Sequence, residues 1–99
     1  MTEHPLQFLI DNDPDLIKLD RDGAALEFSE GALSKKTKIL LALALDASEG
    51  AANGVRALAR EALAAGATRE EILETIRVVH FLGGHSKLYA AAAGLKDVL

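Results

Sequence analysis

Helix start and stop signals divide this chain of 99 residues into five or six segments, and no segment alternates apolar and polar residues as a strand does. Alanine, leucine, glutamate, lysine and arginine dominate the composition, and all favour helix. The first expected helix runs from Pro5 to about Ile10, the second starts at Pro14 behind the N-cap Asp13, and the third is capped by Ser34. The fourth runs from about Ala52 to Ala65. The fifth is capped by Thr68 and ended by Gly83-Gly84, and the last begins at His85 or Ser86. The sequence therefore predicts an all-α bundle of about five to six helices, as one domain over residues 1–99 with an acidic helical lead-in at residues 1–30.

The two helices on either side of Gly66 have the clearest patterns. In the first, apolar residues recur at helical spacing and define one inward face: Val55, Leu58, Ala59, Ala62 and Leu63. Gly66 is expected to be its C-cap. In the second, Thr68 and Glu71 have the spacing of a capping box. Its inward face is expected to contain Ile72, Ile76, Val79, His80 and Gly83.

The composition predicts a thin core within one chain. Apolar residues from Ile39 to Leu45 point in nearly every direction around the helix axis, which is typical of a buried helix. However, 18 of the 99 residues are alanine, whose side chain buries little area. Helices of this kind often need a partner subunit, so we expect the chain to form a homo-oligomer.

Acidic residues gather in the first third of the chain. Residues 1–30 hold eight acidic and two basic side chains, a balance of −6, whereas residues 31–99 balance at +2. We expect the acidic segment to lie against basic residues such as Lys35, Lys36 and Lys38. These lysines either form ion pairs with Asp20, Asp22 or Glu30 or belong to a merely solvated face.

The composition also excludes several classes of function. A nucleic-acid partner is not expected, because the chain has neither a basic excess nor an aromatic cluster. The longest apolar run, Ile39 to Leu45, is too short to span a membrane, and the N-terminus does not resemble a signal peptide, so we expect a cytoplasmic protein. There is no cysteine, which excludes disulfides, thiolate metal sites and thiol chemistry. No cofactor or metal is expected.

Residues 63–72, Leu-Ala-Ala-Gly-Ala-Thr-Arg-Glu-Glu-Ile, strongly resemble the carboxymuconolactone decarboxylase and alkylhydroperoxidase AhpD-like family. The resemblance extends to residues 31–38, Gly-Ala-Leu-Ser-Lys-Lys-Thr-Lys, and to Phe-Leu-Gly-Gly at residues 81–84 before an alanine-rich final helix. It covers roughly residues 31–95. It implies an all-helical fold and assembly into homo-oligomers, commonly trimers or hexamers.

The redox chemistry of that family does not transfer to this chain. AhpD-like peroxidases resemble one another in a Cys-x-x-Cys pair, a His four residues later and a Glu twelve residues before the first Cys. Aligned on Gly-Ala-Thr, the resemblance places these four positions at Ala51, Gly54, Leu58 and Ile39, and all four are apolar here. A thiol peroxidase needs a nucleophilic thiolate and a base to ionise it. The decarboxylase branch has His and Glu in this helix instead, and Asn53, Gly54 and Leu58 do not match those residues either.

Two histidines could still perform chemistry. His80 is expected on the inward face of its helix, where it is either an acid–base group or a hydrogen-bonded core or interface residue. His85 follows Gly83 and Gly84, near a helix start where free amides and Ser86 could hold an anion; a solvated loop histidine is the alternative. With Tyr89, these residues could line a pocket for a small carboxylate. His4, near the N-terminus, is expected to have no partner.

Three functional hypotheses follow. The first is a homo-oligomeric binding or structural module of this family without the thiol centre. The second is a cofactor-free acid–base enzyme, of decarboxylase or isomerase type, that acts on a small carboxylate through His80 or His85. The third is peroxidase activity as in the wider family, which the residues contradict.

Overall fold

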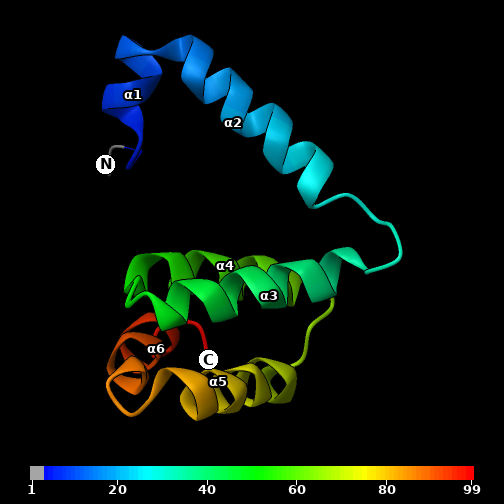
Figure 1. The fold of residues 1–99 in the computed structure, drawn as a ribbon, viewed down its shortest axis with the longest axis vertical. Helices are drawn as coiled ribbons and strands as arrows, with labels where there is room; N and C mark the ends of the chain where they lie inside the picture. The colour runs from blue at the N-terminus through cyan, green and yellow to red at the C-terminus, as the bar shows by residue number, and fades with distance from the viewer. Residues whose placement is uncertain (1–3) are drawn as a thin grey trace.

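The fold is all-α, as predicted, and four of the helices pack into one bundle in this computed structural model, which describes residues 4–99 (Figure 1). The helices are α1 (Gln7–Asn12), α2 (Pro14–Glu27), α3 (Lys35–Ser48), α4 (Ala52–Ala64), α5 (Arg69–Gly83) and α6 (Lys87–Leu95). In the bundle, α3 packs against α4 and α5, and α6 packs against the same two helices. No helix in the described range is long and apolar enough to cross a membrane.

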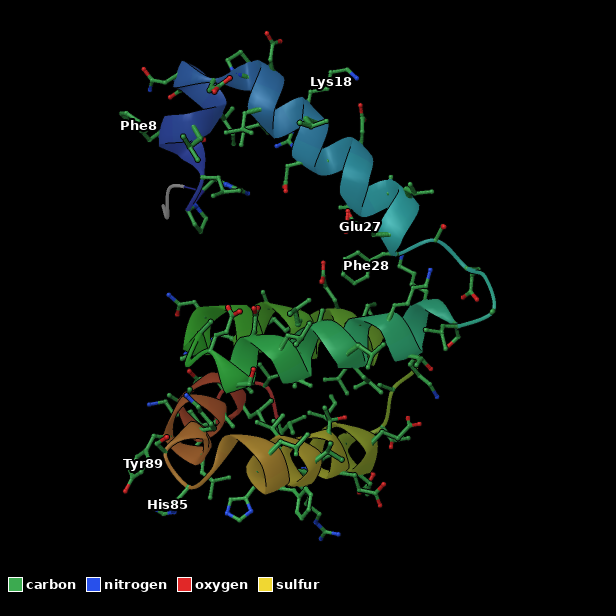
Figure 2. The ribbon with its side chains drawn as sticks, viewed as in Figure 1. Phe8, Lys18, Glu27, Phe28, His85 and Tyr89 are labelled. Atoms are coloured by element: carbon green, nitrogen blue, oxygen red, sulfur yellow. The ribbon has the colours of Figure 1, made fainter. Side chains whose placement is uncertain are left out.

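The helices α1 and α2 form an arm that stands away from the bundle (Figure 1). Their backbones contact each other but no helix of the bundle. Ile17 is the one buried residue of the two helices. Phe28, which ends α2, packs against the edge of the bundle core and faces it in Figure 2. The acidic lead-in is therefore a separate structural element joined to the bundle at this end.

The predicted caps explain where the longer helices begin. The carboxylate of Asp13 accepts the backbone N–H three residues on (3.2 Å), and the hydroxyl of Ser34 does the same (3.1 Å). The capping box is complete, because the Thr68 hydroxyl accepts from the N–H of Glu71 (3.0 Å) and the Glu71 carboxylate accepts from the N–H of Thr68 (2.8 Å). These bonds satisfy N–H groups that a helix start leaves without partners.

Three predicted details are corrected by the structure. The first helix spans Gln7–Asn12, because the residues before it form a turn in which Nδ1 of His4 accepts the N–H of Leu6 (3.0 Å). His4 therefore has a partner. The C-cap of α4 is Ala65, and Gly66 follows it with a φ of +97°, a left-handed conformation that favours glycine.

The core lies within the bundle and depends on small residues. Its fully buried large side chains are Leu43, Val55 and Ile72. The helices α4 and α6 approach each other closely at Gly94. A Cβ atom at Gly94 would lie 2.7 Å from both the carbonyl oxygen of Ala52 and a methyl carbon of Val55. Glycine is thus required there by direct contact.

The helix α3 is buried on one side only. Ile39, Leu43 and Ala47 face the core, whereas Leu41 and Leu45 are 52% and 64% exposed. The prediction of a helix buried all round is therefore wrong for a single chain, because no element within residues 4–99 covers the second face.

Of the two interpretations of the lysines, ion pairing with the acidic segment does not occur within residues 4–99. Asp22 pairs with Lys18 inside the arm (2.6 Å), and Lys36 pairs with Glu71 inside the bundle (3.0 Å). Lys38 donates to a backbone carbonyl in the loop after α2 (2.7 Å). In the part of the chain that the structure describes, no ion pair joins the arm to the bundle.

Candidate functional site

An open groove of about 440 Å³ lies between α5 and α6. Apolar side chains dominate its lining: Leu73, Ile76, Leu88, Ala91, Ala92 and Leu95. Ala91 and Leu95 are buried and form the floor, whereas Leu73 is partly open to solvent. This volume is within the range of small-molecule sites.

The two polar residues of this groove are Arg77 and His80, both exposed and both on α5. Three residues apart on a helix, they lie on neighbouring turns of one face. Arg77 forms no ion pair with any residue in the range 4–99. The groove thus combines an apolar surface with an unpaired guanidinium and an imidazole, an arrangement that suits a carboxylate with an apolar body.

The prediction that His80 points inward is wrong for one chain, because the residue is exposed at the edge of the groove. The buried face of α5 is formed by Ile72 and Val79, with Ile76 half-buried between them. His80 is one position past Val79 and so falls at the margin of that face. Arg77 was not predicted as a site residue, although its spacing of three residues from His80 places both on one helix face.

His80, His85 and Tyr89 do not form a common pocket. Figure 2 shows His85 and Tyr89 together at the turn between α5 and α6, where their rings meet edge to face with centroids 5.6 Å apart. Both are exposed, and neither lines the groove that contains His80. Gly84 has a φ of +86° and ends α5, and Ser86 makes no side-chain cap bond to α6. Gly83 is half-buried against the side chain of Lys87. The glycine pair thus ends α5 and does not line the groove.

The four positions of the absent redox site fall in two places. Ile39 is buried and Leu58 is half-buried, and both line a second groove of about 800 Å³ between the C-terminal half of α2 and the bundle. Ala51 is the N-cap of α4, and Gly54 lies in the first turn of that helix. The carboxylate of Asp46 occupies the space that a side chain at Gly54 would need.

The carboxyl group of Glu71 has a lowered pKa, and its role is structural. The backbone N–H of Thr68 first, and then the ammonium group of Lys36, lower the pKa of its carboxyl. Both partners stabilise the charged form. Because Lys36 is on α3, this carboxylate both caps α5 and ties it to its neighbour. It lies at the start of α5 and does not line the α5–α6 groove.

Comparison with known proteins gives one family match and one similar solved structure. The family model described as the carboxymuconolactone decarboxylase family matches residues 14–97. A crystal structure of the apo form of a carboxymuconolactone decarboxylase family protein from Legionella pneumophila is 32% identical, with a TM-score of 0.85. That match covers 92% of this chain and 81% of the Legionella chain. A search of curated proteins found no match. From the matched residues and the shared fold, we conclude that this chain belongs to the carboxymuconolactone decarboxylase family.

Proposed function

We propose that this protein is a homo-oligomeric binding protein that takes up a small carboxylate with an apolar body in the α5–α6 groove. The observation that carries the proposal is the unpaired guanidinium of Arg77 beside His80, at the edge of an otherwise apolar groove. Arg77 offers a planar pair of donors to a carboxylate, and His80 adds a third donor. The apolar part of the ligand packs on Ile76, Ala91 and Leu95.

The physical chemistry of the groove supports a weak but selective site. Contact with the lining side chains removes apolar ligand surface from water. A charge-assisted hydrogen bond contributes about 1.5–3 kcal/mol, more than a neutral one. The groove is open, so water competes for these hydrogen bonds and lowers their contribution to the binding free energy. The charge should therefore decide which ligands bind, and the apolar floor should decide their size.

Assembly into a trimer or hexamer is the second part of the proposal. The exposed leucines of α3, Leu41 and Leu45, and the arm that leaves the bundle favour a chain whose surface is completed by other copies.

Binding can be tested by calorimetric titration with benzoate, using the neutral isostere benzamide for comparison. We expect benzoate to bind and Arg77→Gln to weaken its affinity by about 10-fold or more, because one charge-assisted contact is lost. Arg60→Gln is the matched control, since Arg60 is exposed on α4 and lines no part of the groove. Equal binding of benzoate and benzamide, or an unchanged affinity in Arg77→Gln, would refute the proposed site.

The position of His80 favours one alternative, a cofactor-free acid–base enzyme acting on the same class of ligand. An imidazole beside a bound carboxylate could transfer a proton to or from the adjacent carbon. His80→Gln separates the two functions, because glutamine keeps a hydrogen-bond donor but cannot titrate. If His80→Gln still binds the ligand but no longer converts it, the result would support the acid–base enzyme.

A further inference from the structure

The arm has an apolar stripe that packs against no helix of the bundle and is largely exposed in the described part of the chain. Along α2 the stripe consists of Leu16, Leu19, Gly23 and Leu26, at intervals of three, four and three residues. This is the spacing with which one helix packs along another. Leu19 and Leu26 are 69% and 76% exposed. On α1, Phe8 is 73% exposed, and Figure 2 shows it pointing away from the rest of the chain.

An arm of this size is not expected to hold its helices alone. The helix α1 has six residues and α2 has fourteen, and isolated helices shorter than about 12–15 residues are marginal in water. Ile17 is the one side chain that the two helices bury. Most of the stability of a protein helix comes from packing of its apolar face. The arm stripe therefore needs a surface outside its own chain.

A matching surface lies at the C-terminal end of α5. Val78, Phe81 and Leu82, here called the α5 patch, are 62%, 84% and 84% exposed. Phe81 and Leu82 are the most exposed large apolar residues among those described. These three residues are about as exposed as those of the arm stripe, and they lie on two adjacent turns of α5.

The charges of the two surfaces are opposite. The segment Gln7–Glu27 holds six acidic and two basic side chains. The segment 75–96, which includes the α5 patch, has no acidic residue and contains Arg77, Lys87 and Lys96. Two arms packed on each other would place acid beside acid. The exposed leucines of α3 are a poorer receptor, because two acidic residues, Asp46 and Glu49, lie one and four positions after Leu45.

The two surfaces lie on opposite sides of the molecule, since α3 and α4 separate the arm from α5 (Figure 1). One chain cannot bring its own arm to its own α5 patch without crossing the bundle. We propose that the arm stripe of each chain docks on the α5 patch of a second copy. Such a head-to-tail contact joins two different surfaces, and repeated copies form a ring when the rotation between neighbouring copies closes. The inference rests on the assembly part of the proposed function and is independent of ligand binding.

The absence of native cysteine makes disulfide cross-linking a clean test. The full-length double variant Leu19→Cys/Phe81→Cys is treated with oxidised glutathione and analysed on non-reducing gels. We expect a ladder of covalent multimers that forms about 100-fold faster than in either single variant, because docking gives the two thiols a high effective concentration. A mixture of Leu19→Cys and Phe81→Cys should give a covalent dimer and no larger species.

The control double variant Leu19→Cys/Leu45→Cys pairs the arm with the exposed face of α3, and we expect it to cross-link no faster than the single variants. Faster cross-linking of this control than of Leu19→Cys/Phe81→Cys would overturn the inference, as would rapid cross-linking of Leu19→Cys alone. All substituted residues are exposed, and circular dichroism checks that helix content is kept. If light scattering shows a wild-type oligomer but Leu19→Cys/Phe81→Cys does not cross-link, the inference fails and the assembly proposal stands. A wild-type monomer refutes both.

Discussion

The arm and the bundle each contain a helix of fourteen residues that starts at a side-chain N-cap, but the two helices bury very different numbers of side chains. Both α2 and α3 have fourteen residues and a side-chain N-cap. In α3, three residues are buried in a core shared by four helices, whereas in α2 only Ile17 is buried. Helix formation is thus a local property of both segments, while burial depends on what lies beside them.

The same contrast holds for charged residues. In the bundle, Lys36 joins α3 to Glu71 on α5, and Arg56 joins α4 to the end of α6 through the carbonyl oxygen of Ala93 (2.9 Å). In the arm, the one ion pair, between Lys18 and Asp22, lies within a single helix. The bundle therefore has cross-links between helices, and the arm has only local ones.

The largest expected difference is between two matched leucine substitutions. Leu43 is fully buried, so Leu43→Ala should lower the free energy of unfolding by about 2–5 kcal/mol. Leu19 is exposed on the arm, so Leu19→Ala should change it by less than about 0.5 kcal/mol under conditions where the chain is monomeric. Urea unfolding followed by circular dichroism gives both values. Similar losses in the two variants would mean that the arm is part of the cooperative fold.

Two helix caps provide a smaller and sharper comparison. Thr68→Ala removes half of the capping box and should destabilise the bundle by about 1 kcal/mol. Asp13→Ala removes the cap of α2 and should loosen that helix without moving the unfolding midpoint of the bundle. Amide exchange at the start of each helix measures the local effect, and urea unfolding measures the global one. A shift of the midpoint in Asp13→Ala would contradict the separation of arm and bundle.

The lowered pKa of Glu71 adds a pH dependence to the stability of the bundle. Because the folded pKa lies below the unfolded value, the carboxylate stabilises the fold above about pH 4.3. That contribution is lost as the pH falls through the lower, folded pKa. Glu71→Gln should therefore be less stable than wild type at pH 7, and the two unfolding curves should converge in acid. A difference that stays constant from pH 7 to pH 3 would show that charge is not its source.

The sequence predicted the parts of this fold that depend on neighbouring residues. The Thr68–Glu71 capping box, the Ser34 cap and the end of α5 at Gly83 and Gly84 were all correct, since each depends on a few adjacent residues. The family resemblance quoted from residues 63–72 also agrees with the family match.

The rest depended on how the helices pack. The periodicity of α5 places His80 at the margin of its inward face. Whether a residue at that margin is buried depends on where α6 lies, which the periodicity does not show. The groove beside Arg77 likewise depends on how α6 lies against α5, since both helices line it. The sequence predicted Leu41 and Leu45 to be buried, and their exposure follows from the absence of a second neighbour for α3 within one chain.

The central claim is that the bundle folds by itself and that a second copy orders the arm. Hydrogen exchange of the backbone amides, measured over a series of protein concentrations, tests it most directly. The account predicts that amides of α3 and α4 keep the same protection throughout, whereas protection of α2 rises as the chains assemble. Protection of α2 that is as strong in the dilute monomer as in the concentrated sample would contradict it.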